Sequence, residues 1–293
     1  MDGFELTPVE GLRTPIVIMA FTGWSDTGTV TTDVAEHLVE AYSAERFLEI
    51  DPEEYYVFSE TRPTVSIGPE GIRELNWPKN EAFAAKLPDA AHDIVIVSGA
   101  EPNLNWRSFA VQLADALAAL EPSLVCTLVA RQAATPHTRP IPVTGSSADP
   151  ALAAKFGLGR SMYQGPTGIL GVLHDELRKR EVPLISMAAG IPHYLNVEEN
   201  PAATAALLRA LEPVLGLMPP LGDLEEESER FLARVEEASR GDSQIVEYVR
   251  TLEEHYGEDM EEDEEDDQGA ELPSADELLK DVEDFLRGNG DSG

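Results

Sequence analysis

Four short apolar segments of the chain, each of strand type, end in loops rich in Gly, Pro and polar or aromatic residues. These segments span residues 15–21, 93–98, 124–130 and 182–189. Amphipathic stretches lie between them, the first with Val30, Val34 and Leu38 spaced four apart, and this spacing predicts helices. Strands that alternate with helices over short connections are typical of a parallel α/β sheet. Because ligands bind at the carboxyl ends of such strands, we expect function at the four loops.

Three strand-like stretches follow the first helix: residues 55–58, 64–67 and 72–77. With a turn candidate at 68–71, they are interpreted as antiparallel strands added to the same sheet. The third apolar segment leads into a long loop, residues 131–144. Asn200 and Pro201 have the residue types preferred at the N-cap and at the first position of a helix. Residues 1–218 are therefore predicted to form one three-layer α/β domain with a mostly parallel sheet.

The composition shifts after this domain. Residues 219–256 are predicted to form a pair of charged helices with thin apolar stripes that include Phe231 and Ile245, as expected for docking on the body or on a partner subunit. Residues 257–293 are predicted to be an acidic disordered tail. Within it, residues 274–287 read as a short amphipathic helix that starts with a capping box. This segment is either a docking peptide or part of a solubilising tail with a transient helix.

The chain carries 55 Asp and Glu against 21 Lys and Arg, a formal charge of −34. An excess of this sign argues against nucleic-acid partners and against an anionic membrane surface. The single cysteine, Cys126, lies between apolar neighbours and is predicted to be a buried structural thiol. Neither a secretory leader nor an apolar run of membrane-spanning length is evident, so a cytoplasmic location is predicted.

The four loops bring together a candidate ligand-binding set: Trp24, Ser25, Asp26, Glu101, Arg139, Gly165, Thr167, Gly168, His193 and Tyr194. Glu101, His137 and His193 are candidate catalytic residues, because a carboxylate beside a histidine is the minimum equipment for acid–base chemistry. Arg139 and the helix start at Gly168 could hold an anionic group. The chain has no established catalytic signature, and the spacing of its histidines supports no metal site, so no cofactor is predicted.

Each of these residues also has a structural interpretation. Asp26 is of a type that caps helices, and the Pro-His pairs that contain His137 and His193 fit rigid turns. Trp24 and Trp106 fit either lids over the edge of the core or contacts between subunits, and we include Trp106 with Phe231 and Ile245 as candidate interface residues.

An ordered set of motifs links the loops to a known family. The motifs are Gly23-Trp24-Ser25-Asp26-Thr27-Gly28, Gly99-Ala100-Glu101-Pro102 with Trp106 after it, Pro136-His137-Thr138-Arg139-Pro140, Tyr163-Gln164-Gly165-Pro166-Thr167-Gly168 and Pro192-His193-Tyr194. In this order and spacing the sequence resembles the proteasome assembly chaperone family, in its actinobacterial branch, over about residues 13–215.

The resemblance implies a phosphorylase/hydrolase-like α/β/α domain and self-association, with a trimer as one form. It also implies a protein-binding assembly factor or adaptor without catalysis, with the proteasome or other proteins as partners. Relatives often engage partners through C-terminal tails, but this sequence lacks a hydrophobic–Tyr–X terminus, so docking by the terminal carboxylate is not expected. The alternative is a small-molecule-binding enzyme or sensor, hydrolase/phosphorylase-like or ligase-like, that uses the pocket at the strand ends.

Overall fold

The computed structural model describes residues 4–7, 9–69, 71–241 and 243–256. It divides into two compact units, each built from three stretches of the chain. Unit 1 comprises Met1–Ser25, Ala35–Leu128 and Pro166–Ile185, and unit 2 comprises Asp26–Val34, Val129–Gly165 and the chain from Ser186 onward. The predicted acidic tail at 257–293, with its helix at 274–287, lies outside the described residues.

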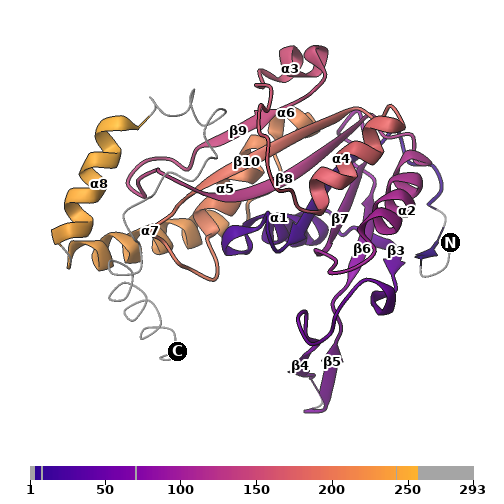
Figure 1. Ribbon diagram of the computed structural model, residues 1–293, viewed down its shortest axis with the longest axis horizontal. Helices are drawn as coiled ribbons and strands as arrows, with labels where there is room; N and C mark the ends of the chain where they lie inside the picture. Colours follow the sequence, from indigo (N-terminus) through magenta and orange to yellow (C-terminus); the bar gives the residue numbers. More distant parts are fainter. Residues whose placement is uncertain (1–3, 8, 70, 242, 257–293) are drawn as a thin grey trace. The chain divides into compact units, whose positions relative to one another are not determined.

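An eight-stranded sheet has the order β1-β3-β6-β7-β2-β8-β10-β9 (Figure 1). Its strands are β1 (Phe4–Leu6), β2 (Ile16–Thr22), β3 (Glu45–Ile50), β6 (Asn80–Ala85), β7 (Ile94–Ala100), β8 (Leu124–Ala133), β9 (Val143–Ser146) and β10 (Leu184–Pro192). In the centre, β2 pairs in parallel with β7 and β8, whereas β1, β3, β6 and β9 join by antiparallel pairing. This mixed sheet with a parallel centre confirms the predicted α/β class.

Helices cover both faces of the sheet (Figure 1). They are α1 (Val30–Ala41), α2 (Trp106–Ala118), α3 (Pro150–Phe156), α4 (Ile169–Lys179), α5 (Pro201–Ala210), α6 (Glu212–Leu215), α7 (Leu224–Arg240) and α8 (Ser243–His255), with 3₁₀ turns at Thr27–Thr29 and Pro52–Glu54. As predicted, Asn200 caps α5, because its side chain accepts a hydrogen bond from the Ala203 amide at 3.1 Å. None of the helices in the described part of the chain combines the length and apolar character needed to cross a bilayer.

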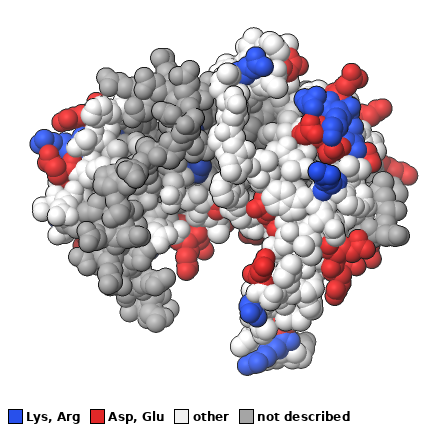
Figure 2. Space-filling model, in the orientation of Figure 1, with Lys and Arg blue, Asp and Glu red and all other residues white. Residues whose placement is uncertain are grey.

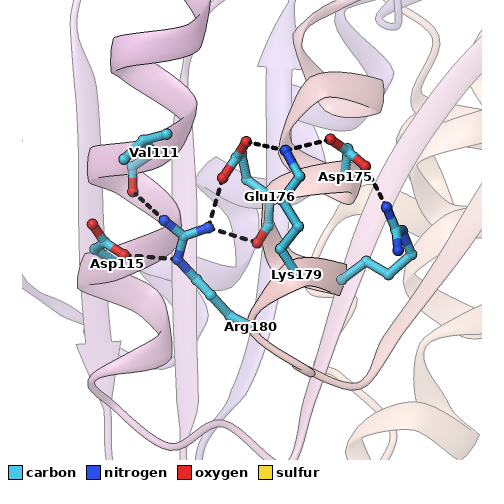
Figure 3. Close-up of polar contacts among 7 residues, drawn as sticks. Val111, Asp115, Asp175, Glu176, Lys179 and Arg180 are labelled. Atoms are coloured by element: carbon cyan, nitrogen blue, oxygen red, sulfur yellow. Dashed lines mark hydrogen bonds and ion pairs between the residues drawn. The ribbon is translucent and has the colours of Figure 1, made fainter.

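The core of unit 1 forms around β2, whose residues from Ile16 to Phe21 are all buried. A strand covered on both faces reads as a continuous apolar run, which is why it could be predicted. Helix α2 adds Phe109, whose ring meets Tyr55 edge-on with the centroids 5.2 Å apart. At the surface, Arg180, the C-cap residue of α4, donates to Asp115 of α2 at 2.7 Å, which ties the ends of the two helices together (Figure 3).

A two-stranded hairpin projects from unit 1 as a separate sheet of β4 (Thr64–Ile67) and β5 (Arg73–Asn76) (Figure 1). The hairpin was predicted, but its placement in the main sheet was wrong. Residues 55–58 do not form a strand. Tyr55 ends a 3₁₀ turn, and its side chain packs into the core, so the apolar character of this stretch reflects side-chain burial and not strand pairing. The loop predicted at 131–144 is shorter, because β8 continues to Ala133 and β9 begins at Val143 to pair with β10.

Candidate functional site

In unit 1 Glu101, which directly follows β7, links the end of β2 to the start of α4. The Glu101 carboxylate accepts a hydrogen bond from the Ile169 amide at 2.7 Å, and its own backbone amide donates to the Thr22 carbonyl at 3.1 Å. Gly168, the N-cap residue of α4, has no side chain to do this, and a Cβ there would come 2.6 Å from Glu101 Oε1. The protein's own carboxylate therefore occupies the helix N-terminus at which an anion was expected.

Trp24 lies beside this cap and is 70% exposed. It follows Gly23, whose φ of +111° is in the left-handed region that glycine tolerates and other residues rarely adopt. A Cβ on Gly23 would also come within 3.2 Å of the Glu101 side chain. The backbone conformation at Gly23 therefore sets the direction of the turn, and on this turn the Trp24 ring is exposed to solvent.

In unit 2 a group of side chains that we term the His–Tyr cluster lies at the ends of β8 and β10. Its members are His137, His193 and Tyr194, which are buried, and Tyr248 and Glu236, which are half-buried. Tyr194 lies at its centre, with its ring centroid 5.8 Å from that of His137 and 5.7 Å from that of His193. The two predicted histidines therefore contact the same tyrosine. Tyr248 of α8 and Glu236 of α7 complete the cluster from the C-terminal helices.

Hydrogen bonds assign opposite tautomers to the two histidines. The Glu236 carboxylate can only accept, so His137 Nε2–H donates to it at 3.2 Å, and in the neutral ring Nδ1 then accepts from the Tyr194 hydroxyl at 2.7 Å. The same hydroxyl accepts from the His137 amide at 2.7 Å. His193 has the reverse arrangement, since its Nδ1 faces the Ala133 carbonyl at 3.2 Å and must donate. Its Nε2 accepts from the Tyr248 hydroxyl at 3.0 Å. All four ring nitrogens are thus bonded to protein.

Burial shifts the pKa of the His137 ring and of the Tyr194 hydroxyl. It lowers the pKa of His137, and the neighbouring Glu236 opposes this only in part. Burial also raises the pKa of Tyr194 above its ordinary value, so the central hydroxyl stays neutral. A network in which every ring nitrogen is bonded to the protein is suited to holding elements together.

The cluster fastens α7 and α8 to the body of unit 2. Their apolar stripes pack in one core cluster with Tyr194 and its neighbours: Leu195, Ala202, Phe231, Val235, Ile245, Val249 and Leu252. Phe231 and Ile245, predicted as interface residues, are therefore buried within the chain. Arg139, predicted as an anion ligand, lies 3.7 Å from Glu253 of α8, and the Tyr256 hydroxyl donates to the Pro140 carbonyl at 2.9 Å.

Other predicted residues also have partners within the chain. Asp26 accepts from the Thr31 amide at 2.6 Å and from the Thr32 hydroxyl at 2.6 Å, so it anchors the first turn of α1. The Trp106 indole donates to the Pro102 carbonyl. Ser25 is half-buried, whereas Gly165 and Thr167 are exposed in the loop before α4. Sequence reasoning missed Tyr248 and Glu236, which no local motif marks.

Cys126 is buried, and burial raises the pKa of its thiol far above the ordinary value. Among the residues that the structure describes, no group of three or more His, Cys, Asp and Glu side chains is placed to hold a metal ion. The described loops thus bring acids, histidines and tyrosines to the strand ends mainly as structural partners.

The PAC2 family profile matches residues 20–239. The chain belongs to the PAC2 family. A PAC2 family protein from Streptomyces avermitilis is 38% identical, with a TM-score of 0.74, over 80% of this chain and 99% of its own. A proteasome-assembly chaperone homologue from Mycobacterium tuberculosis is 37% identical, with a TM-score of 0.72, over the same shares of the two chains. The resemblance drawn from the loop motifs is therefore confirmed.

More distant structures share the fold. An archaeal proteasome activator from Pyrococcus furiosus is 22% identical, with a TM-score of 0.63, over 80% of this chain and 98% of its own. The search of curated proteins finds no match to this sequence.

Proposed function

We propose that this PAC2 protein is a non-catalytic, protein-binding assembly factor or adaptor that is linked to the proteasome and acts as a homo-oligomer. The observation that carries the proposal is its 37% identity to a proteasome-assembly chaperone homologue over nearly all of that chain. Identity at this level across a whole domain supports a related role, whereas likeness of fold alone would not.

The bonding of the candidate catalytic groups supports a role without catalysis. An acid–base residue must reach a substrate proton at hydrogen-bond distance. Glu101 instead caps α4, and both ring nitrogens of His137 and of His193 bond to protein atoms. Each of these residues would have to leave a structural bond before it could act on a substrate.

Exposed apolar side chains support a role in protein binding. Trp24 is the most exposed tryptophan that the structure describes, and it stands on a turn fixed by Gly23 and Glu101. Tryptophans on rigid supports are frequent anchors of protein interfaces. We therefore assign Trp24 to contact with a protein partner. Self-association is the other part of the proposal, since exposed apolar surface of this kind marks interfaces.

Binding of the purified full chain to proteasome subunits of the same organism tests the proposal. Co-elution on a sizing column and a titration at low and moderate salt should both show a complex. Trp24→Ser should weaken binding about 10- to 30-fold, because loss of an interface anchor costs about 2 kcal/mol. Leu6→Ser is the matched control, since Leu6 is also exposed and apolar but lies on an edge strand.

Two outcomes would contradict the proposal. The absence of a complex at either salt concentration would remove the link to the proteasome. A monomer at every concentration in analytical ultracentrifugation would contradict self-association. It would not bear on binding to the proteasome, which the co-elution and titration experiments test separately.

A further inference from the structure

The hairpin of unit 1 has one polar and one apolar face. We term residues 59–79 the β4–β5 arm. Cross-strand pairs of an antiparallel ladder share a face, and here Val65 pairs with Leu75 and Ile67 with Arg73. The alternate pairs, Thr64 with Asn76 and Ser66 with Glu74, form the other face. Asn76 donates to the Ser66 hydroxyl at 2.9 Å, so the polar face satisfies part of its own bonding.

The apolar face of the arm is in water. Ile67 is 73% exposed, Val65 58% and Leu75 53%. At the base, Trp77 packs edge-on against Phe58, with 4.7 Å between the ring centroids, yet stays 41% exposed. A two-stranded sheet is marginally stable alone and needs a further strand or a packed face. The arm therefore presents an apolar surface that a further segment can cover.

The position of Arg73 on the apolar face, opposite Ile67, shows what kind of segment fits there. Residues 59–79 carry three basic and three acidic side chains, within a chain whose net charge is −34. Among the described residues, neither Arg62 nor Arg73 forms an ion pair. Figure 2 shows the arm as largely uncharged surface with basic side chains near its end. A complementary segment is apolar on one side and carries carboxylates.

We propose that residues 274–287 of the same chain bind the apolar face of the arm. At helical spacing, Leu278, Leu279, Val282, Phe285 and Leu286 form one apolar stripe. The same stretch carries five acidic and two basic residues. Apolar residues can therefore meet Val65, Ile67 and Leu75 while carboxylates reach Arg62 and Arg73. An amphipathic helix on an apolar surface is a common mode of peptide recognition.

The connecting chain is long enough for this contact. Residues 257–273 provide 17 residues, which span about 55–60 Å when extended. A connection of this length lets the segment bind surfaces well away from the end of α8. The tether also keeps the effective concentration of the segment near the millimolar range, so even a weak intramolecular contact is occupied.

A disulfide test in the full chain is clean because Cys126 is buried and inert. The test variant carries Leu75→Cys and Leu279→Cys. The matched control carries Glu74→Cys and Leu279→Cys, which has the same tether but places the arm thiol on the opposite face. We expect the test pair to crosslink within one chain at least tenfold faster than the control under mild oxidation, as measured by mass and non-reducing electrophoresis.

Three results would overturn the proposal. Equal rates in the two variants would mean random collision of the tethered thiols. The absence of any crosslink would leave the arm uncovered by this segment. A crosslink only between chains, with a rate that depends on protein concentration, would assign the arm to a second copy.

Hydrogen exchange of the arm amides provides a readout without new cysteines. In full-length Leu279→Ser/Phe285→Ser protein, the amides of β4 and β5 should exchange about tenfold faster than in the parent chain, since the covering segment is lost. Asp291→Asn, outside the segment, should leave the exchange unchanged. Exchange of β4 and β5 that is the same in all three proteins would contradict the proposal.

Discussion

Acid should destabilise this protein through His174, which faces the core from α4. Its Nε2 lies 2.9 Å from the Thr127 hydroxyl of β8, and burial lowers the pKa of the ring from 6.5 to about 4. In the unfolded chain the ring takes up a proton below pH 6.5, whereas in the folded protein it stays neutral until about pH 4. The unfolded state therefore gains protons first, and stability present above pH 6.5 is lost as the pH falls towards 4.

The size of this loss follows from the two pKa values. A pKa difference of about 2.5 corresponds to about 3 kcal/mol, at about 1.4 kcal/mol for each pKa unit. His137, whose pKa burial also lowers, adds a loss of the same sign. Comparing the parent chain with His174→Gln isolates the contribution of His174, because glutamine keeps a polar group near Thr127 but does not titrate.

Urea unfolding at pH 7.5 and 4.5 measures the effect. Between these pH values the parent chain should lose about 2–3 kcal/mol more unfolding free energy than His174→Gln. The half-buried His92→Gln serves as the control for a histidine-to-glutamine change elsewhere in unit 1. An equal loss in the parent and in His174→Gln, or a His174 ring that titrates near pH 6.5 by NMR, would refute the reasoning.

Three further substitutions test other contacts. Glu101→Ala should lower the free energy of unfolding by about 1–2 kcal/mol and speed hydrogen exchange of the first α4 amides, because the Ile169 amide loses its acceptor. Glu101→Gln keeps an acceptor and should recover most of the loss. Gly99→Ala should cost about 1–3 kcal/mol in thermal unfolding, since its Cβ would come 2.6 Å from the Lys79 carbonyl oxygen. Tyr194→Phe should lower the free energy of unfolding by about 1–3 kcal/mol and speed proteolysis at α7 and α8, because the buried His137 amide loses its acceptor. Unchanged proteolysis would show that the His–Tyr cluster does not hold these helices on unit 2.

Burial on two faces explains which strands could be predicted. The central strands β2, β7, β8 and β10 are nearly continuous apolar runs, and all four were found. The outer strands were missed because their sequences are polar or rich in alanine: β3 carries Glu45 and Glu49, and β6 reads Asn-Glu-Ala-Phe-Ala-Ala. Such residues have low strand propensity, and pairing with a formed neighbour overrides it.

The candidate residues show the same division. Local patterns identified Asn200 as a cap, and the capping interpretation of Asp26 agrees with its bonds to Thr31 and Thr32. Partners far along the chain could not be predicted: Tyr248 lies 55 residues from His193, and Glu236 lies 99 from His137. These bonds form only when α7 and α8 pack on unit 2, so no local spacing encodes them.

The interleaved path of the chain has a consequence for synthesis on the ribosome. Neither compact unit is a continuous piece, since unit 1 needs Pro166–Ile185 and unit 2 begins at Asp26 but needs the chain from Ser186 onward. At about 5–20 residues per second, the apolar run of β2 emerges roughly 10–30 s before unit 1 can close. The nascent protein therefore spends that interval with unit 1 incomplete, before α4 can add its buried residues Ile169, Leu170, Leu173 and Leu177 to the core.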